Sequence, residues 1–187
     1  ILLHFRNDNP EFGKKDAEIL INEVISKTPG LKLQIVHLGG YGGFDKATKE
    51  VISAFIEEYE RNKSLDKSNI VFDISGVVVT ENEEIKGILY STTEEQHKKI
   101  ADYIRTWGIE NIVFGSDWPY SSPVSYINNI KRLLPLSKAE FEKILSNDTT
   151  IRMFGSSEIR HPDLKKLLET YKEGIDYNAI LSIKFGE

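Results

Sequence analysis

Residues 31–40 read LKLQIVHLGG, a short apolar run that ends in a histidine and a pair of glycines. The run is too short for a core helix and is rich in aliphatic residues, so it predicts a buried strand over residues 31–38. Gly39 and Gly40 predict the turn that follows this strand. Three further runs of the same character predict strands at residues 1–5, 70–75 and 112–116.

Helical patterns alternate with these strands. Apolar residues recur at helical spacing in residues 45–62 and 93–107, where Asp45 and Thr93 are the expected N-caps and Gly108 is the expected stop. Shorter helices are expected at residues 14–27, 125–134 and 138–146, and a hairpin is expected around residues 81–84. Four successive strand–helix units predict an α/β chain with a parallel sheet and right-handed crossovers.

The composition is that of a globular protein. Hydrophobic residues make up 40% of the chain and charged residues 28%, with a net charge of −5. This acidic balance provides no broad basic surface, so we expect no nucleic-acid partner. No apolar run approaches the roughly 20 residues of a membrane helix, so we expect no membrane association. The absence of cysteine excludes disulfide scaffolds and thiolate chemistry. We favour a cytoplasmic location, with the periplasm or secretion as alternatives.

Polar residues gather at the carboxyl ends of the predicted strands, where parallel α/β folds bind ligands. His4 lies near the end of the first run, His37 ends the second, and Asp117 follows the fourth. Imidazole nitrogens and carboxylate oxygens are common ligands of divalent metals and common acid–base groups. Arg6 lies two residues after His4 and therefore faces the same side of a strand, where its guanidinium suits a substrate carboxylate.

Each of these residues also has a structural interpretation. His4 could be a hydrogen-bonded core histidine, Arg6 a member of a surface ion pair, and Asp117 a cap for the loop that follows it. Asp73 could orient a histidine or serve as a structural acceptor, and we favour the structural role. We interpret His97, in a predicted helix, as a surface residue.

Three segments, taken in order, resemble a known family. VHLGG at 36–40, FDISG at 72–76 and FGSDWP at 114–119 resemble the second half of the amidohydrolase superfamily. The branch that they resemble contains aminocarboxymuconate-semialdehyde decarboxylase and related carboxylate-processing enzymes. Residues 143–155 also resemble the closing helix of that family.

The resemblance implies a (β/α)₈ TIM-type barrel, which is incomplete in this chain because its four units would be strands five to eight. Residues 1–155 would form the C-terminal half of a metal-dependent hydrolase barrel, and residues 156–187 a C-terminal helical tail. The chain starts inside an expected strand, and the H-x-H pair that the family carries on strand one does not occur. We therefore expect a missing N-terminal half of the barrel as a partner, with pairing of two copies in a homo-oligomer as the other possibility.

The resemblance also implies roles for the candidate residues. His4 would be the metal-ligating histidine of strand five, and His37 the strand-six histidine that polarises the substrate or activates metal-bound water. Asp117 would be the strand-eight aspartate, which is both a metal ligand and a proton acceptor. The implied cofactor is a divalent metal, with zinc expected. The role of Arg6 in substrate binding is inferred from strand alternation alone.

The leading hypothesis is an amidohydrolase-type metal-dependent hydrolase, or a non-oxidative decarboxylase, that acts on a small carboxylate-bearing substrate with metal-activated water. An alternative is a catalytically incomplete half-barrel that acts as a binding or assembly module, which the missing H-x-H pair favours. A third hypothesis is an open doubly wound domain that binds phosphate on the loop at residues 39–43. That loop lacks both the dinucleotide-binding and the P-loop spacing of glycines.

Overall fold

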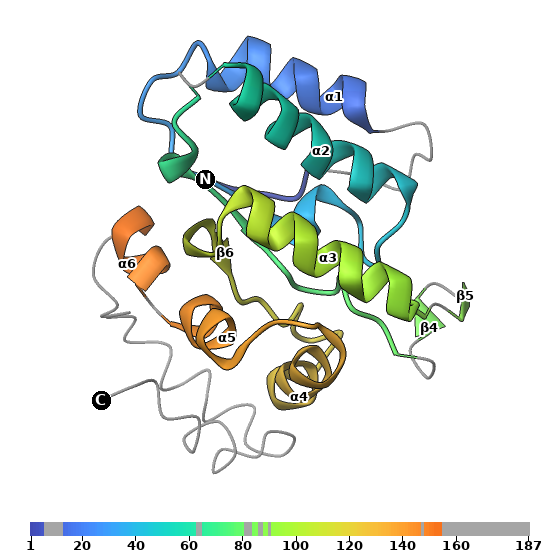
Figure 1. Ribbon diagram of the computed structural model, residues 1–187. Coiled ribbons are helices and arrows are strands. Elements are labelled where there is room, and N and C mark those ends of the chain that lie inside the picture. Colours follow the sequence, from blue (N-terminus) through green and yellow to red (C-terminus); the bar gives the residue numbers. More distant parts are fainter. Residues whose placement is uncertain are drawn as a thin grey trace.

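The computed structural model describes residues 1–5, 13–62, 65–80, 84–85, 88–89, 91–146 and 148–154 (Figure 1). The main sheet contains four parallel strands in the order β1 (Leu2–Leu3), β2 (Leu33–Ile35), β3 (Ile70–Asp73) and β6 (Ile112–Val113). This confirms the predicted α/β class with a parallel sheet. A doubly wound sheet reverses its strand order at a switch point. The strand order here follows the chain without a reversal in the described sheet, which argues against the doubly wound hypothesis.

Helices join the strands and cover one face of the sheet. The connecting helices are α1 (Lys14–Ile19), which continues as a π-helical segment (Leu20–Ile25), α2 (Lys46–Arg61) and α3 (Glu94–Trp107). After β6 the chain forms α4 (Pro123–Leu133), α5 (Lys138–Leu145) and α6 (Asp148–Phe154). Figure 1 shows α1, α2 and α3 side by side, and α2 contacts both of its neighbours. Helices that follow one another along the same face are what the wall of a β/α barrel requires.

The expected helix boundaries agree closely with the structure. The Thr48 amide donates to Oδ1 of Asp45 at 2.8 Å, which makes Asp45 the N-cap of α2. Thr93 and Gln96 form a reciprocal capping box at the start of α3. Gly108 ends α3 with a φ of 114°, a conformation that favours glycine.

The main core lies between the sheet and these helices. The side chains that the strands direct toward the helices are buried and apolar: Leu33, Ile35, Ile70, Phe72 and Ile112. The Phe72 ring packs edge-on against Phe55 of α2 at 5.3 Å and against Trp107 of α3 at 5.4 Å between centroids. In the register, Phe72 lies opposite Ile35 on one side and Ile112 on the other, so this layer aligns the three strands.

The opposite face of the sheet carries both apolar and polar side chains. Val71 and Val113 form a small cluster with Met153 of α6. Gln34 and Asp73, which alternate with the helix-facing residues, form a hydrogen bond with each other at 3.0 Å. In the register, Gln34 lies opposite Val71 and Asp73 opposite Val113. Asp73 is the last residue of β3 and so lies at the carboxyl edge, where ligands are expected.

The strands are shorter than predicted, and the clearest case is β2. The prediction extended to residue 38, but the backbone of His37 and Leu38 is left-handed, with φ values of 55° and 51°. The predicted hairpin lies slightly later, as β4 (Glu84–Ile85) paired antiparallel with β5 (Ile88–Leu89). The predicted tail at residues 156–187 lies outside the described residues. No helix in the described ranges combines the length and apolar character needed to cross a bilayer.

Candidate active site

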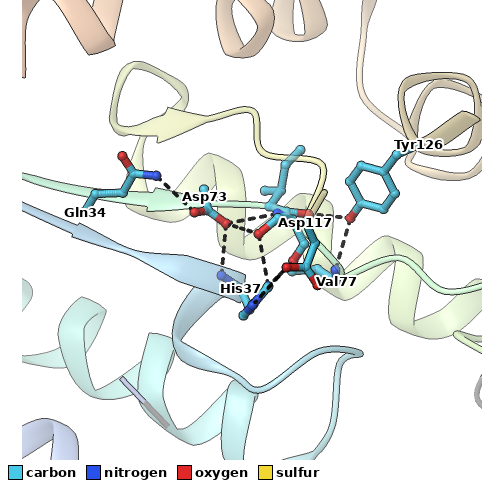
Figure 2. Close-up of polar contacts among 8 residues, drawn as sticks. Gln34, His37, Asp73, Val77, Asp117 and Tyr126 are labelled. Atoms are coloured by element: carbon cyan, nitrogen blue, oxygen red, sulfur yellow. Dashed lines mark hydrogen bonds and ion pairs between the residues drawn. The ribbon is translucent and has the colours of Figure 1, made fainter. Parts of the chain in front are cut away.

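His4, His37 and Asp117, which follow three different strands, lie together at the carboxyl edge of the sheet. The His4 and His37 rings meet edge to face, with centroids 5.0 Å apart and planes at 73°. Nε2 of His37 lies 3.9 Å from Oδ1 of Asp117 (Figure 2). The His37 side chain is 6% exposed and the Asp117 side chain 36% exposed, while His4 is exposed. The three candidates thus share one site that is open to solvent on the side of His4.

The hydrogen bonds of His37 assign its neutral tautomer. Its Nδ1 atom lies 2.6 Å from the backbone carbonyl oxygen of Ser75. A carbonyl can only accept, so the proton of the neutral ring is on Nδ1 and the lone pair is on Nε2. Nε2 is also the atom that faces Asp117. His37 is therefore oriented to accept a proton, or to bind an electrophile, on the side of Asp117.

Asp73 is a structural acceptor that holds the backbone of His37, which agrees with the interpretation that we favoured. Its Oδ1 accepts from the backbone amides of His37 and Ser75, each at 3.0 Å, and from the Ser75 hydroxyl at 2.5 Å. Its Oδ2 accepts from the side-chain amide of Gln34 at 3.0 Å. These contacts offset the cost of the left-handed backbone at His37, which is on the order of 1 kcal/mol.

Asp117 also has a left-handed backbone, with a φ of 63°, and the Trp118–Pro119 peptide bond that follows is cis. Gly76 lies between Asp117 and His37. A Cβ atom at Gly76 would lie 3.4 Å from both Oδ2 of Asp117 and Nδ1 of His37. That separation is an ordinary van der Waals contact, so the feature that favours glycine at position 76 is its left-handed backbone, with a φ of 59°.

Arg6 and His97 were also interpreted from the sequence. Arg6 lies outside the described residues, so its role in substrate binding stays a prediction. His97, interpreted as a surface residue, is buried at 6% exposure, and that interpretation was wrong. Its Nε2 lies 2.8 Å from Oγ1 of Thr92, and burial lowers its pKa. His97 is buried because it lies one turn before Ile100, on the packing face of α3.

Sequence reasoning did not assign two residues that support the site, one at the end of the third predicted strand and one on a helix. Ser75 provides the carbonyl that fixes the His37 ring. Tyr126 of α4 is buried against the turn that contains Ser75. An aromatic residue with a polar tip on the apolar side of a predicted helix was the only signal for Tyr126, because such a hydroxyl needs a buried partner.

The donor types at the site suit a divalent metal, since zinc and related ions bind imidazole nitrogen and carboxylate oxygen. Across the described part of the chain, however, no group of three or more His, Cys, Asp or Glu residues could hold a metal ion.

The family profile Amidohydro_2, described as amidohydrolase, matches residues 9–155. The chain belongs to the amidohydrolase family. This confirms the resemblance that the three motifs indicated. The comparison with curated proteins gives no match.

Several solved structures are similar in fold. An amidohydrolase from Burkholderia multivorans with bound zinc is 19% identical with a TM-score of 0.50, over 75% of this chain and 49% of that one. Amidohydrolase 2 from Bifidobacterium longum subsp. infantis is 22% identical with a TM-score of 0.45, over 81% of this chain and 48% of that one. A 2,6-dihydroxybenzoate decarboxylase complexed with 2,6-dihydroxybenzoate is 16% identical with a TM-score of 0.46, over 82% of this chain and 50% of that one. The chain described here therefore spans about half the length of these three proteins. At these identities the similarity concerns the fold alone.

Proposed function

We propose that this chain forms part of an amidohydrolase-type active site that acts on a small carboxylate-bearing substrate, by hydrolysis or by non-oxidative decarboxylation. The observation that carries the proposal is the placement of His37 Nε2 at 3.9 Å from Asp117 Oδ1, with the His4 ring against His37. Membership of the amidohydrolase family supports this reaction class.

His37 and Asp117 can hold one water or substrate hydroxyl between them. Their facing atoms are 3.9 Å apart, which is too long for a direct hydrogen bond. Two acceptors at this separation can both lie within roughly 2.6–3.2 Å of a single donor oxygen. When the bound group is a water, one hydrogen points to the lone pair on His37 Nε2 and the other to the Asp117 carboxylate. A substrate hydroxyl has one hydrogen and donates it to one of the two. His37 is almost fully buried, which strengthens these electrostatic contacts.

His4 and Asp117 are the residues that would hold a divalent metal, with zinc as the expected ion. When bound, such a metal supplies Lewis-acid polarisation of a substrate oxygen. The remaining ligands would come from an N-terminal half of the barrel, in which case β1, β2, β3 and β6 correspond to strands five to eight. We propose Arg6 as the contact for the substrate carboxylate, two residues after His4.

A half-barrel that serves as a binding or assembly module is the second candidate. It is favoured because the sequence has no H-x-H pair and because the described residues include no group of three possible metal ligands. This function predicts a stable, metal-free oligomer of the chain, which light scattering and metal analysis would detect together.

The metal content of the complete natural protein separates these two functions. His4→Ala and Asp117→Ala should each lower the bound metal, whereas His97→Gln should retain it because His97 lies in a different hydrogen-bond network. Unchanged metal content in both site variants would contradict the catalytic proposal.

A further inference from the structure

We infer that Tyr126 of α4 is a positioning residue for His37, because its hydroxyl fixes the turn whose carbonyl fixes the His37 ring. The catalytic meaning of this inference rests on the proposed function of His37. The geometry does not depend on that function, and neither does the test below.

The Tyr126 hydroxyl joins the two ends of the turn that follows β3. It accepts from the backbone amide of Val77 at 3.0 Å (Figure 2). It also accepts from the amide of Val78 at 3.2 Å and donates to the backbone carbonyl of Ile74. A phenol has one proton to donate and lone pairs to accept, so this buried hydroxyl is fully used. Tyr126 is 1% exposed, so water does not reach these backbone groups to take the place of the hydroxyl.

The same turn holds the acceptor for the His37 ring. Ser75 lies inside it, and its carbonyl accepts the Nδ1 proton of His37 at 2.6 Å. The turn is also tied to the loop after β2, since the Gly43 amide donates to the Gly76 carbonyl at 2.6 Å. Tyr126 and His37 are thus connected through one short and closely bonded stretch of backbone.

The Ser75 carbonyl sets which nitrogen of His37 carries the proton. The Ser75 hydroxyl lies 3.0 Å from Nδ1 and donates its own proton to Asp73, so its oxygen is a second acceptor for the Nδ1 proton. Both acceptors belong to Ser75, so if the turn loosens, Nδ1–H loses its fixed acceptors and the alternative tautomer with the proton on Nε2 becomes accessible. That tautomer has no lone pair on the side that faces Asp117. Two supports from different elements therefore prepare His37: Asp73 of β3 holds its backbone, and Tyr126 of α4 holds its ring acceptor.

The tautomer of His37 in the full chain tests the inference directly. Nitrogen NMR of the imidazoles, at a pH where they are neutral, reports the ratio of Nδ1–H to Nε2–H, and His37→Gln assigns the signal. The wild type should show mainly the Nδ1–H form. Tyr126→Phe should lower the ratio by about five-fold. This is the change expected when the hydrogen bond from His37 Nδ1 to the Ser75 carbonyl is lost. Tyr103→Phe is the matched control, because its hydroxyl lies 2.9 Å from Oγ of Ser53 on the helix layer. A folded Tyr126→Phe variant with the wild-type ratio would overturn the inference.

If Tyr126→Phe does not fold, the wild type provides the test in urea below the unfolding transition. Hydrogen-exchange protection of the Val77 and Val78 amides should fall together with the Nδ1–H population of His37. The inference is overturned if His37 keeps its tautomer after those amides have lost protection. Neither readout uses metal or activity, so a metal-free, inactive protein would refute the proposed function and leave this inference standing.

Discussion

Nε2 of His37 lies 3.9 Å from Oδ1 of Asp117, although the two residues follow β2 and β6, which are not neighbours in the sheet. The strand between them is β3, and Gly76, in the turn that follows it, lies beside both side chains, since a Cβ there would be 3.4 Å from Asp117 Oδ2 and from His37 Nδ1. The relationship also shows why the site needs contributions from several strands at one edge of a parallel sheet.

Gly76→Ala should disturb the site as well as the backbone. Its φ of 59° makes any side chain unfavourable by about 1 kcal/mol, and the new methyl would touch both His37 and Asp117. We expect metal affinity of the complete natural protein, measured by competition with a chelator, to fall roughly tenfold or more. Gly30→Ala is the matched control, since Gly30 has a φ of 79° and a Cβ there would have no neighbour within 4 Å. Equal metal affinities for the two variants would contradict this account.

Asp73→Ala should destabilise the fold by about 3 kcal/mol, because it leaves the buried amides of His37 and Ser75 without their acceptor. Urea unfolding measures this loss. Asp66→Ala removes an exposed aspartate that accepts from Ser68 and Asn69, and should cost only about 1 kcal/mol. The assignment of Asp73 fails if the two variants lose the same stability.

Acid should destabilise the protein through His97. Burial lowers the pKa of His97 from the ordinary value of 6.5, so the unfolded chain takes up its proton first as the pH falls. Stability is therefore highest above pH 6.5 and decreases below it. His97→Gln should make the unfolding free energy less sensitive to pH over that range. NMR titration should place the His97 pKa below 6.5, and a value at or above 6.5 would show that the imidazole is not buried as described.

A second acid-sensitive contact joins α3 to α5. Arg105 binds Glu140 through two hydrogen bonds, at 2.7 and 3.1 Å, and the Ser137 amide donates to the same carboxylate at 2.6 Å. Arg105 first and Ser137 second lower the pKa of Glu140 to about 2. The stabilisation is present above the ordinary value of 4.5 and is lost as the pH falls toward 2. It should amount to about 1 kcal/mol, as for a well-formed pair near the surface. In Glu140→Gln, the unfolding free energy should no longer decrease through this contact as the pH falls from 4.5 toward 2. An unchanged pH dependence of the unfolding free energy would show that the contact between Arg105 and Glu140 is not its source.

Much of the fold could be predicted because its signals are local. Short apolar runs, three of which are followed by glycine or proline, indicated the positions of the strands, and Asp45 and Thr93 marked the starts of two helices. The meeting of His4, His37 and Asp117 followed from topology, since the carboxyl ends of parallel strands share one edge.

The parts that could not be predicted depend on contacts between distant segments. The left-handed turn at His37 shortens β2, and it is held by Asp73 of the next strand along the sheet. His97 is different, since its burial follows from a local signal, its position one turn before Ile100 on α3. The support from Tyr126 comes from α4, and no pattern around residue 126 indicates which backbone groups its hydroxyl will contact.

The most direct test of the proposed site is the position of the metal in a crystal of the complete natural protein grown with zinc. Anomalous scattering at the zinc absorption edge locates the ion independently of any assumption about its ligands. The account predicts a peak within about 2.0–2.2 Å of a His4 ring nitrogen and of an Asp117 carboxylate oxygen. It is contradicted if zinc binds elsewhere while His4 and Asp117 remain without it.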